Sequence, residues 1–216
     1  NLPNVLTACP GNDIEAPLPI TLAVSKPLSI AESEKYAHMT YFLNGGYDHA
    51  VAGENRILIA SPAVDHYDLT PKMSAQKLTK MVLDNLEKNR YNFIAVNFAN
   101  PDMVGHTGNL RATIEACEFV DNCVGQIFQE TLRKDGLLII TADHGNAEEM
   151  IDLKTGEINT QHTNNPAPFI LVGKNYSKNK IEFLENGVLG DIAPTILHLL
   201  EKEINKLMTG KVLIKR

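Results

Sequence analysis

The chain has 216 residues, of which 44% are hydrophobic and 21% are charged, and its formal net charge is −6. This length and composition are typical of one globular domain with a sizeable core. The acidic balance argues against nucleic acid as a partner, because phosphate contacts need clustered Lys and Arg. No apolar run approaches the roughly 20 residues of a membrane helix.

The first 27 residues are predicted to be irregular, because prolines recur through them without any apolar periodicity. We expect a loop, or the end of a linker from something upstream. The chain begins with Asn1 and not with Met, which suggests that it was cut from a longer one. The N-terminal residues lack the basic segment and the long apolar run that are typical of a signal peptide.

The three cysteines stand at positions 9, 117 and 123 and form no C-x-x-C pair. Their odd number favours reduced thiols in the cytoplasm over a disulfide framework. We expect them to be buried and inert.

The first regular elements are a short strand over residues 28–31 and a helix over residues 32–44. Apolar side chains recur three and four positions apart in that helix, and the glycine pair 45–46 supplies its stop. A strand over residues 56–60 follows. The next helix has Ser74 as its N-cap and runs to about residue 89.

The rest of the chain alternates strands with helices. Strands are predicted at residues 93–98, 137–141 and 168–172, and helices at residues 110–134 and 191–200, the last capped by Asp191. Two loops separate them, one after residue 98 and a polar one over residues 146–167 with a hairpin turn at 153–156. This alternation predicts an α/β fold with a mostly parallel sheet, right-handed crossovers and helices on both faces.

Two of the predicted strands run into an Asp and a His. Asp143 and His144 directly follow one strand, and Asp102 and His106 follow another. Ligands in open α/β sheets gather outside the carboxyl ends of the strands. These four side chains are therefore candidates for one site, and His162 on the polar loop is a fifth.

Carboxylates and neutral imidazoles without sulfur suit Mn, Zn, Co or Fe. Five such side chains exceed the needs of one ordinary site, so a two-metal site that clamps both reacting oxygens of a phosphoryl transfer is one interpretation. The residues alone leave the bland alternatives open, in which residues 143–146 form a simple turn and His162 is a polar surface residue.

A series of longer motifs occurs in a fixed order at residues 30–38, 44–46, 61–62, 67–68, 73–75, 97–108, 141–148, 161–163 and 208–211. Together they resemble the cofactor-independent phosphoglycerate mutases of the alkaline phosphatase superfamily. The resemblance implies an incomplete alkaline-phosphatase-like fold that lacks its N-terminal part. Residues 28–216 are then the C-terminal part of the metal-binding phosphatase-like domain, and residues 1–27 are a linker or the end of a missing inserted domain.

The resemblance implies that 3-phosphoglycerate and 2-phosphoglycerate are interconverted in glycolysis and gluconeogenesis, through a phosphoserine intermediate and without bisphosphoglycerate. It implies two divalent ions, Mn²⁺ in the first place with Mg²⁺, Co²⁺ or Zn²⁺ as alternatives. Asp102, His106 and His162 are expected to hold one ion, and Asp143 and His144 to belong to the other. The enzyme is expected to be cytoplasmic and, when complete, monomeric.

Lys35 matches the family's lysine beside the transferring phosphate and is expected to be a catalytic and substrate-binding residue. An ammonium group there would stabilise charge on the phosphoryl oxygens, and Glu34 is expected to orient it. The family's serine nucleophile, a further metal-binding Asp and its substrate arginines have no counterpart in this chain. We therefore expect the chain to be inactive alone, with the missing N-terminal part of the same protein as its partner.

Two alternatives stay open. Another enzyme of the same superfamily, such as a metal-dependent phosphatase or a phosphopentomutase, would share the metal ligands, although Glu34, Lys35 and the motif at 161–163 favour the mutase. A metal-binding or structural fragment without catalysis would explain why the serine and the arginines are absent.

Overall fold

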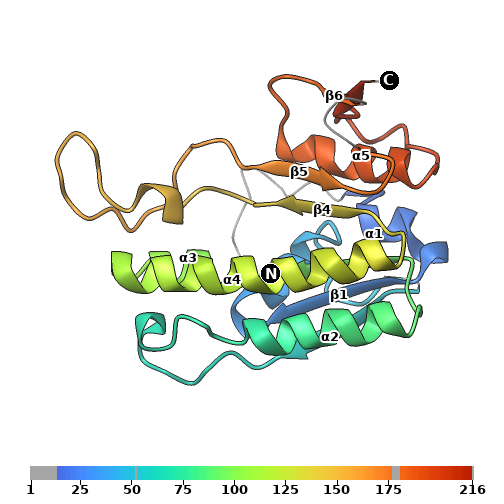
Figure 1. The fold of residues 1–216 in the computed structure, drawn as a ribbon. Helices are drawn as coiled ribbons and strands as arrows, with labels where there is room; N and C mark the ends of the chain where they lie inside the picture. The colour runs from blue at the N-terminus through green and yellow to red at the C-terminus, as the bar shows by residue number, and fades with distance from the viewer. Residues whose placement is uncertain (1–13, 52, 177–180, 216) are drawn as a thin grey trace, which may run out of the picture.

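The computed structural model describes residues 14–51, 53–176 and 181–215 (Figure 1). Its helices are α1 (Leu18–Thr21), α2 (Ala75–Glu87), α3 (Asn100–Gly105), α4 (Leu110–Arg133) and α5 (Ile192–Leu199). Its strands are β1 (Pro27–Glu32), β2 (Asn55–Ile59), β3 (Phe93–Asn97), β4 (Leu138–Thr141), β5 (Phe169–Val172), β6 (Glu182–Phe183) and β7 (Ile214–Lys215). Each strand predicted before residue 173 is present and close to its predicted bounds.

β1 is the central strand of a three-stranded parallel sheet in the order β2–β1–β3. Ile30 on β1 is level with Ile57 on β2 and with Val96 on β3. All six residues of β1 are buried, as expected for a parallel strand that is covered on both faces. The predicted parallel sheet is confirmed for these three strands.

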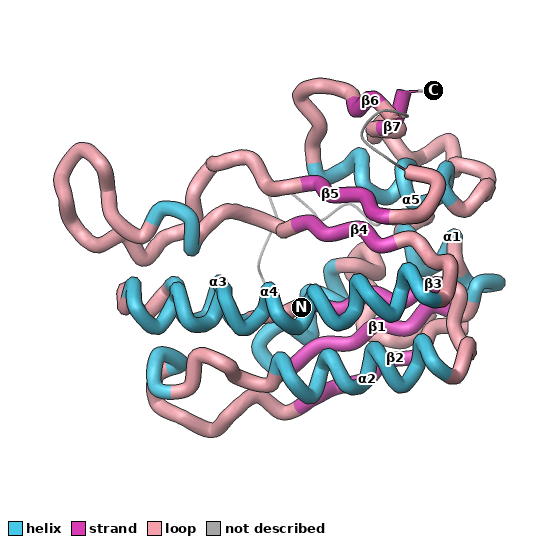
Figure 2. The backbone as a smooth tube through the Cα atoms, viewed as in Figure 1, coloured by secondary structure: helices cyan, strands magenta, loops and turns pink. Residues whose placement is uncertain are grey.

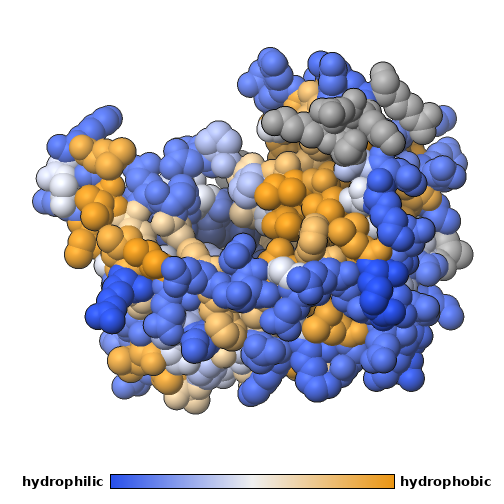
Figure 3. Space-filling view, viewed as in Figure 1, coloured by the Kyte–Doolittle hydropathy of each residue, from blue (hydrophilic) through white to orange (hydrophobic). Residues whose placement is uncertain are grey.

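β4 and β5 pair antiparallel in a separate two-stranded sheet, so the expectation of parallel pairing is wrong for them. A parallel pair needs a crossover connection, usually a helix, whereas the segment between β4 and β5 contains only one short 3₁₀ turn, Ala147–Glu149. Figure 3 shows hydrophobic side chains over β4 and β5. Leu137 and Ile170 are both substantially exposed, which leaves part of this apolar surface uncovered.

The main core lies between the parallel sheet and two helices. Leu28 and Ile30 of β1 pack with Leu78 and Val82 of α2 and with Ile127 of α4, and all five side chains are buried. Figure 2 shows α2 and α4 running side by side along this face of the sheet. Burial of such side chains stabilises the fold by about 1.5–3 kcal/mol each.

The opposite face of the sheet is covered by shorter elements. Side chains alternate along a strand, so Phe93 of β3 faces away from the main core and packs against Leu18, Leu22 and Leu197. Leu18 lies in α1 and Leu197 in α5. Helices therefore cover both faces, as predicted.

The predicted helix over residues 32–44 is interrupted. Pairing with β2 continues through Glu32, so this residue belongs to the strand and not to the predicted helix. Ser33–Lys35 then forms a 3₁₀ turn and His38–Phe42 a π-helical turn. The predicted stop is confirmed, because Gly45 has φ 71° and Gly46 has φ 99°, values that a glycine adopts without strain.

The segment after β3 is a short helix, α3, and not the predicted loop. Pro101 lies in its first turn, where the missing N–H costs no intrahelical hydrogen bond, so a proline that suggested a loop is compatible with a helix start. The same holds for Pro19 in α1, a helical turn within the part of residues 1–27 that the structure describes. Residues 1–13 of that prediction lie outside the described residues, and the division at residue 27 stays a prediction.

Ser74 and Asp191 occupy the predicted N-cap positions, but neither side chain caps its helix. Ser74 Oγ donates to the carbonyl of Ala60 at 2.8 Å. The Asp191 carboxylate accepts from the backbone N–H groups of Val188 at 2.9 Å and Lys211 at 2.7 Å. Both side chains therefore tie a helix start to a distant segment.

Cys117 and Cys123 are free, the first half-buried and the second buried, and burial raises the pKa of the Cys117 thiol. Cys9 lies outside the described residues. Among the described helices, none has the length and apolar character that crossing a membrane requires.

Candidate metal centre

α3 presents two of the candidate ligands on one face. Asp102 and His106 are four residues apart, and side chains at that spacing meet on a helix surface. His106 Nε2 lies 3.0 Å from Asp102 Oδ1. The helix follows β3 directly and is fixed by buried Val104 and Gly105, so both ligands lie beyond the carboxyl end of a parallel strand.

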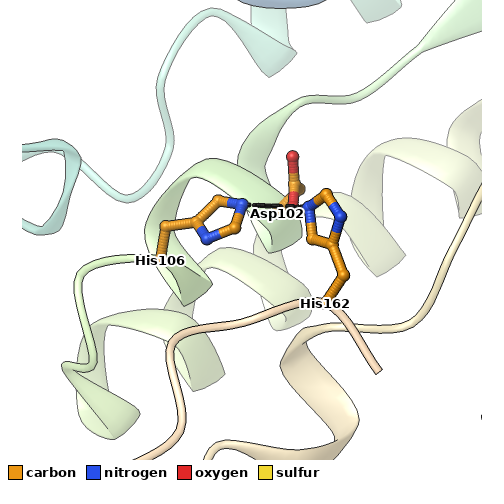
Figure 4. A group of neighbouring side chains, drawn as sticks. All are labelled: Asp102, His106 and His162. Carbon is orange, nitrogen blue, oxygen red and sulfur yellow. Dashed lines mark hydrogen bonds and ion pairs between the residues drawn. The ribbon is translucent and has the colours of Figure 1, made fainter. Parts of the chain in front are cut away.

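His162 reaches the same place from the long connection between β4 and β5 (Figure 4). Its Nε2 lies 3.2 Å from Asp102 Oδ1 and 3.1 Å from His106 Nε2. One ligand atom from each of the three side chains lies within 4.8 Å of the others. A single cation can therefore contact all three.

Asp143 and His144 lie next to this group. His144 Nε2 is 3.5 Å from Asp143 Oδ2 and 4.0 Å from Asp102 Oδ1. The His144 ring stacks on the His162 ring with centroids 3.6 Å apart. All five candidate ligands therefore converge, but only Asp102, His106 and His162 form a compact triad.

Lys35 is the cation of the cluster. Its ammonium group is buried and lies 2.5 Å from Asp102 Oδ2 and 3.9 Å from Asp143 Oδ2. Burial of Asp102 opposes ionisation, but the hydrogen bond and the charge of Lys35 outweigh it and lower the pKa of that carboxyl. Asp102 is therefore a carboxylate with Oδ2 on Lys35 and Oδ1 turned to the histidines.

The donor set fits a divalent metal ion. His106 Nδ1 lies 2.7 Å from the carbonyl oxygen of Thr160, which can only accept, so Nδ1 carries a hydrogen and Nε2 is the ring nitrogen that can offer a lone pair. That lone pair points toward Asp102 Oδ1, a second acceptor. Two acceptors at this distance need a cation or a proton between them, and two imidazoles with one carboxylate suit Mn, Co or Zn.

The expectation that Glu34 orients Lys35 is wrong in this structure. The Glu34 carboxylate accepts from the Tyr67 hydroxyl at 2.7 Å, while the ion pairs of Lys35 go to Asp102 and Asp143. Desolvation and the hydrogen bond to Glu34 raise the pKa of Tyr67 to about 12. Tyr67 belongs to the motif at residues 67–68, but the sequence around it does not predict a hydrogen bond to Glu34.

Two further residues that sequence reasoning gave no role lie against the cluster. Asn146 Nδ2 donates to Asp102 Oδ1 at 2.9 Å. Glu148 accepts from the backbone N–H of Asn146 at 2.7 Å and also from the hydroxyl of Thr163. Both stand in the motif at 141–148, which was the only signal available for them.

The chain matches the family model described as the Metalloenzyme superfamily over residues 22–204. It is 52% identical over 190 residues to the 2,3-bisphosphoglycerate-independent phosphoglycerate mutase of Clostridium botulinum, a match that covers 88% of this chain and 36% of that protein. It is 48% identical over 215 residues to the mutase of Chloroflexus aurantiacus, with 98% and 40% covered. The chain thus spans 36–40% of the length of these curated relatives.

A solved structure is also similar. The crystal structure of Leishmania mexicana phosphoglycerate mutase at low cobalt concentration matches with a TM-score of 0.79 and 28% identity, covering 88% of this chain and 37% of that one. The resemblance to phosphoglycerate mutases that the motifs indicated is confirmed, and so is the expected fold class.

Proposed function

The chain belongs to the Metalloenzyme superfamily, and we propose that it is the metal-binding part of a phosphoglycerate mutase that interconverts 3-phosphoglycerate and 2-phosphoglycerate without bisphosphoglycerate. The observation that carries the proposal is the convergence of Asp102, His106 and His162 on one point, with Lys35 against the same carboxylate. Relatives about half identical to this chain carry the name of that activity.

In this proposal Asp102, His106 and His162 hold one divalent ion, and Asp143 with His144 belongs to a second. Mn²⁺ is the proposed metal, with Co²⁺, Zn²⁺ or Mg²⁺ as alternatives, because the ligands are oxygens and imidazole nitrogens. Such ions, when bound, neutralise the charge that develops on phosphoryl oxygens. The second pair offers fewer ligands within these residues, so the second ion should bind more weakly.

Lys35 would act on the substrate from inside the site. Its ammonium group is buried and lies between two carboxylates, so its position is fixed before any ligand arrives. A fixed cation beside the transferring phosphate stabilises the equatorial oxygens of the transition state without reorganisation. We therefore assign Lys35 as the catalytic residue that also contacts the substrate phosphate.

The serine nucleophile and the arginines that bind the substrate are proposed to come from the remainder of a longer polypeptide, since the chain spans 36–40% of the length of its relatives. The exposed apolar side chains of Leu137, just before β4, and of Ile170 on β5 support a covering segment there. The complete enzyme is proposed to be a cytoplasmic monomer of glycolysis and gluconeogenesis.

The test is a coupled assay for 2-phosphoglycerate, run on the chain alone and on the chain joined to the N-terminal remainder of the Clostridium botulinum relative, both with Mn²⁺. We expect no turnover from the chain alone and mutase turnover from the joined protein. Release of inorganic phosphate without isomer formation would identify a phosphatase instead. Mn²⁺ binding with neither product would identify a metal-binding piece without catalysis.

A further inference from the structure

His162 stands on a part of the chain that leaves the body of the molecule. The connection between β4 and β5 extends away from both sheets (Figure 1), and most of its residues are exposed or half-buried. The His162 side chain itself is 49% exposed. Hydrophobic burial therefore does not hold this histidine against Asp102, and specific contacts must do so, of which the stacked His144 ring is one.

The Glu148 carboxylate joins the two limbs of this connection beside His162, and Glu149 adds one hydrogen bond from Asn165 at 3.0 Å. Glu148, on the outgoing limb, accepts a hydrogen bond from the backbone N–H of Asn146 at 2.7 Å on its own limb. On the returning limb it accepts from the Thr163 hydroxyl and from Asn165 Nδ2, the latter at 3.0 Å. Thr163 is the residue after His162, so the contact acts directly beside the ligand.

The backbone at Gly145 completes the junction. Thr163 N–H donates to the Gly145 carbonyl at 2.9 Å, which forms an isolated antiparallel bridge between the limbs. A Cβ at position 145 would collide with the Thr163 hydroxyl and with Glu148 Oε1. Only glycine lets the limbs approach this closely, so the carboxylate and the bridge form one unit.

We propose that Glu148 is a positioning residue that clamps the returning limb so that His162 completes the metal site. Without the clamp, the returning limb keeps the backbone bridge and the hydrogen bond from Asn165 to Glu149 but loses its ties to Glu148, and His162 spends less time within reach of Asp102 and His106. The inference rests on the proposed metal-binding function and extends it to a residue that does not contact the metal itself.

The charge of Glu148 suits this role. Partial desolvation opposes its ionisation, but hydrogen bonds from Thr163, Asn165 and backbone N–H groups outweigh it and lower the pKa of the carboxyl. Hydrogen bonds to an ionised acceptor are about twice as strong as neutral ones. A neutral amide at this position keeps the shape and one acceptor oxygen, but it loses the hydrogen bonds made to the other oxygen and weakens the rest.

The test is a calorimetric Mn²⁺ titration of the 216-residue chain and its variants, with Co²⁺ absorption spectra as a second readout. Glu148→Ala should weaken Mn²⁺ binding about 10–100-fold, the range for partners that orient a metal ligand, and Glu148→Gln should recover part of that loss. Glu157→Ala is the matched control. It removes a carboxylate from the same connection, but that carboxylate accepts none of the hydrogen bonds found among the described residues, so binding should not change.

A double-mutant cycle separates positioning from general loosening. In a His162→Ala background, Glu148→Ala should change Mn²⁺ affinity by no more than about twofold, because the residue it positions is gone. The Co²⁺ spectrum of Glu148→Ala should shift toward that of His162→Ala, and thermal melting should report both variants as folded. An undiminished Glu148→Ala effect in the His162→Ala background, or no effect in the wild type, would overturn the inference.

Failure of the proposed function looks different. If the wild-type chain binds neither Mn²⁺ nor Co²⁺, the proposed metal-binding function is wrong, and so is the positioning role of Glu148. If the wild type binds both ions and Glu148→Ala binds them equally well, only the role of Glu148 is wrong.

Discussion

Lys35 Nζ lies 2.5 Å from Asp102 Oδ2, while Oδ1 of the same carboxylate faces His106 and His162. The two oxygens therefore have separate partners. The ammonium group satisfies one oxygen and leaves the other for a cation that the two imidazoles share. This division favours coordination of a metal ion by a single Asp102 oxygen and keeps Lys35 fixed at the edge of the site.

Lys35→Met should destabilise the metal-free chain. The change keeps the length of the side chain but leaves the largely buried Asp102 carboxylate without its cation, and we expect a loss of about 3 kcal/mol, the low end for removing one partner of a buried ion pair. Urea denaturation with EDTA present measures this loss. Lys80→Met is the control, because that lysine is exposed and pairs with Asp84 at the surface. Equal effects of the two changes would contradict this account of Lys35.

Asp102→Asn should abolish tight metal binding with little change in shape. The amide cannot supply a charged oxygen to the cation, so we expect Mn²⁺ affinity to fall by at least about 100-fold, the upper end of what indirect partners cost. His106→Ala should give a comparable loss. Calorimetric titration is the measurement, and His49→Ala is the control because His49 is exposed and lies outside the cluster. Retained affinity in Asp102→Asn would exclude this carboxylate as a ligand.

Glu54→Gln should reveal a pH-dependent part of the folding stability. Glu54 is buried, which opposes ionisation, but hydrogen bonds from Arg56, Asn44 and Val51 outweigh burial and lower its pKa below the ordinary 4.5. The unfolded state then takes up the proton at a higher pH than the folded state. The contribution of Glu54 is therefore complete above pH 4.5 and is lost as the pH falls through the lower folded value.

At neutral pH we expect Glu54→Gln to lower the free energy of unfolding by about 3 kcal/mol, because a buried guanidinium partner loses its counter-charge. The difference from the wild type should narrow as the pH is lowered below 4.5 and through the lower folded-state pKa of Glu54. Urea denaturation at a series of pH values tests this expectation. A constant difference at all pH values would indicate that Glu54 contributes through packing alone. Glu130→Gln, at an ion pair whose Arg133 partner is exposed, serves as the control and should show no measurable change.

Gly145→Ala should disturb the metal site without removing a ligand. The added methyl group would collide with the Thr163 hydroxyl and with Glu148 Oε1, so the two limbs of the β4–β5 connection must separate. We expect Mn²⁺ affinity to fall about 10–100-fold, as for other partners that orient a ligand.

Gly125→Ala is the matched control for that change. Nothing lies within 4 Å of its added Cβ, and Gly125 is in the middle of α4. This substitution should stabilise the chain by roughly 0.5–1 kcal/mol, because alanine is the better helix former, and should leave Mn²⁺ binding unchanged. Comparable loss of binding in both variants would show that the effect is not specific to the clamp.

Most of the helices and strands could be predicted from local sequence patterns. The apolar runs of β1, β2 and β3 and the helical spacing of α2 and α4 are properties of contiguous residues, so their positions were predicted closely. The incorrect predictions occur where contacts between residues far apart in the sequence determine the local structure. Pairing with β2 extends β1 through Glu32, and Ser74 bonds to Ala60 instead of capping its own helix.

The candidate site divides in the same way. Asp102, His106, Asp143 and His144 follow strand ends, so the sequence by itself determined that they gather at one edge of the fold, since strand ends and ligand types are local. The family resemblance also led us to expect His162 beside Asp102 and His106. The tertiary structure alone decided that Lys35 takes one oxygen of Asp102 and that Glu148 joins the two limbs. Those contacts link segments with no periodic pattern of their own. Their geometry depends on how the chain returns from a long connection, which no local pattern encodes.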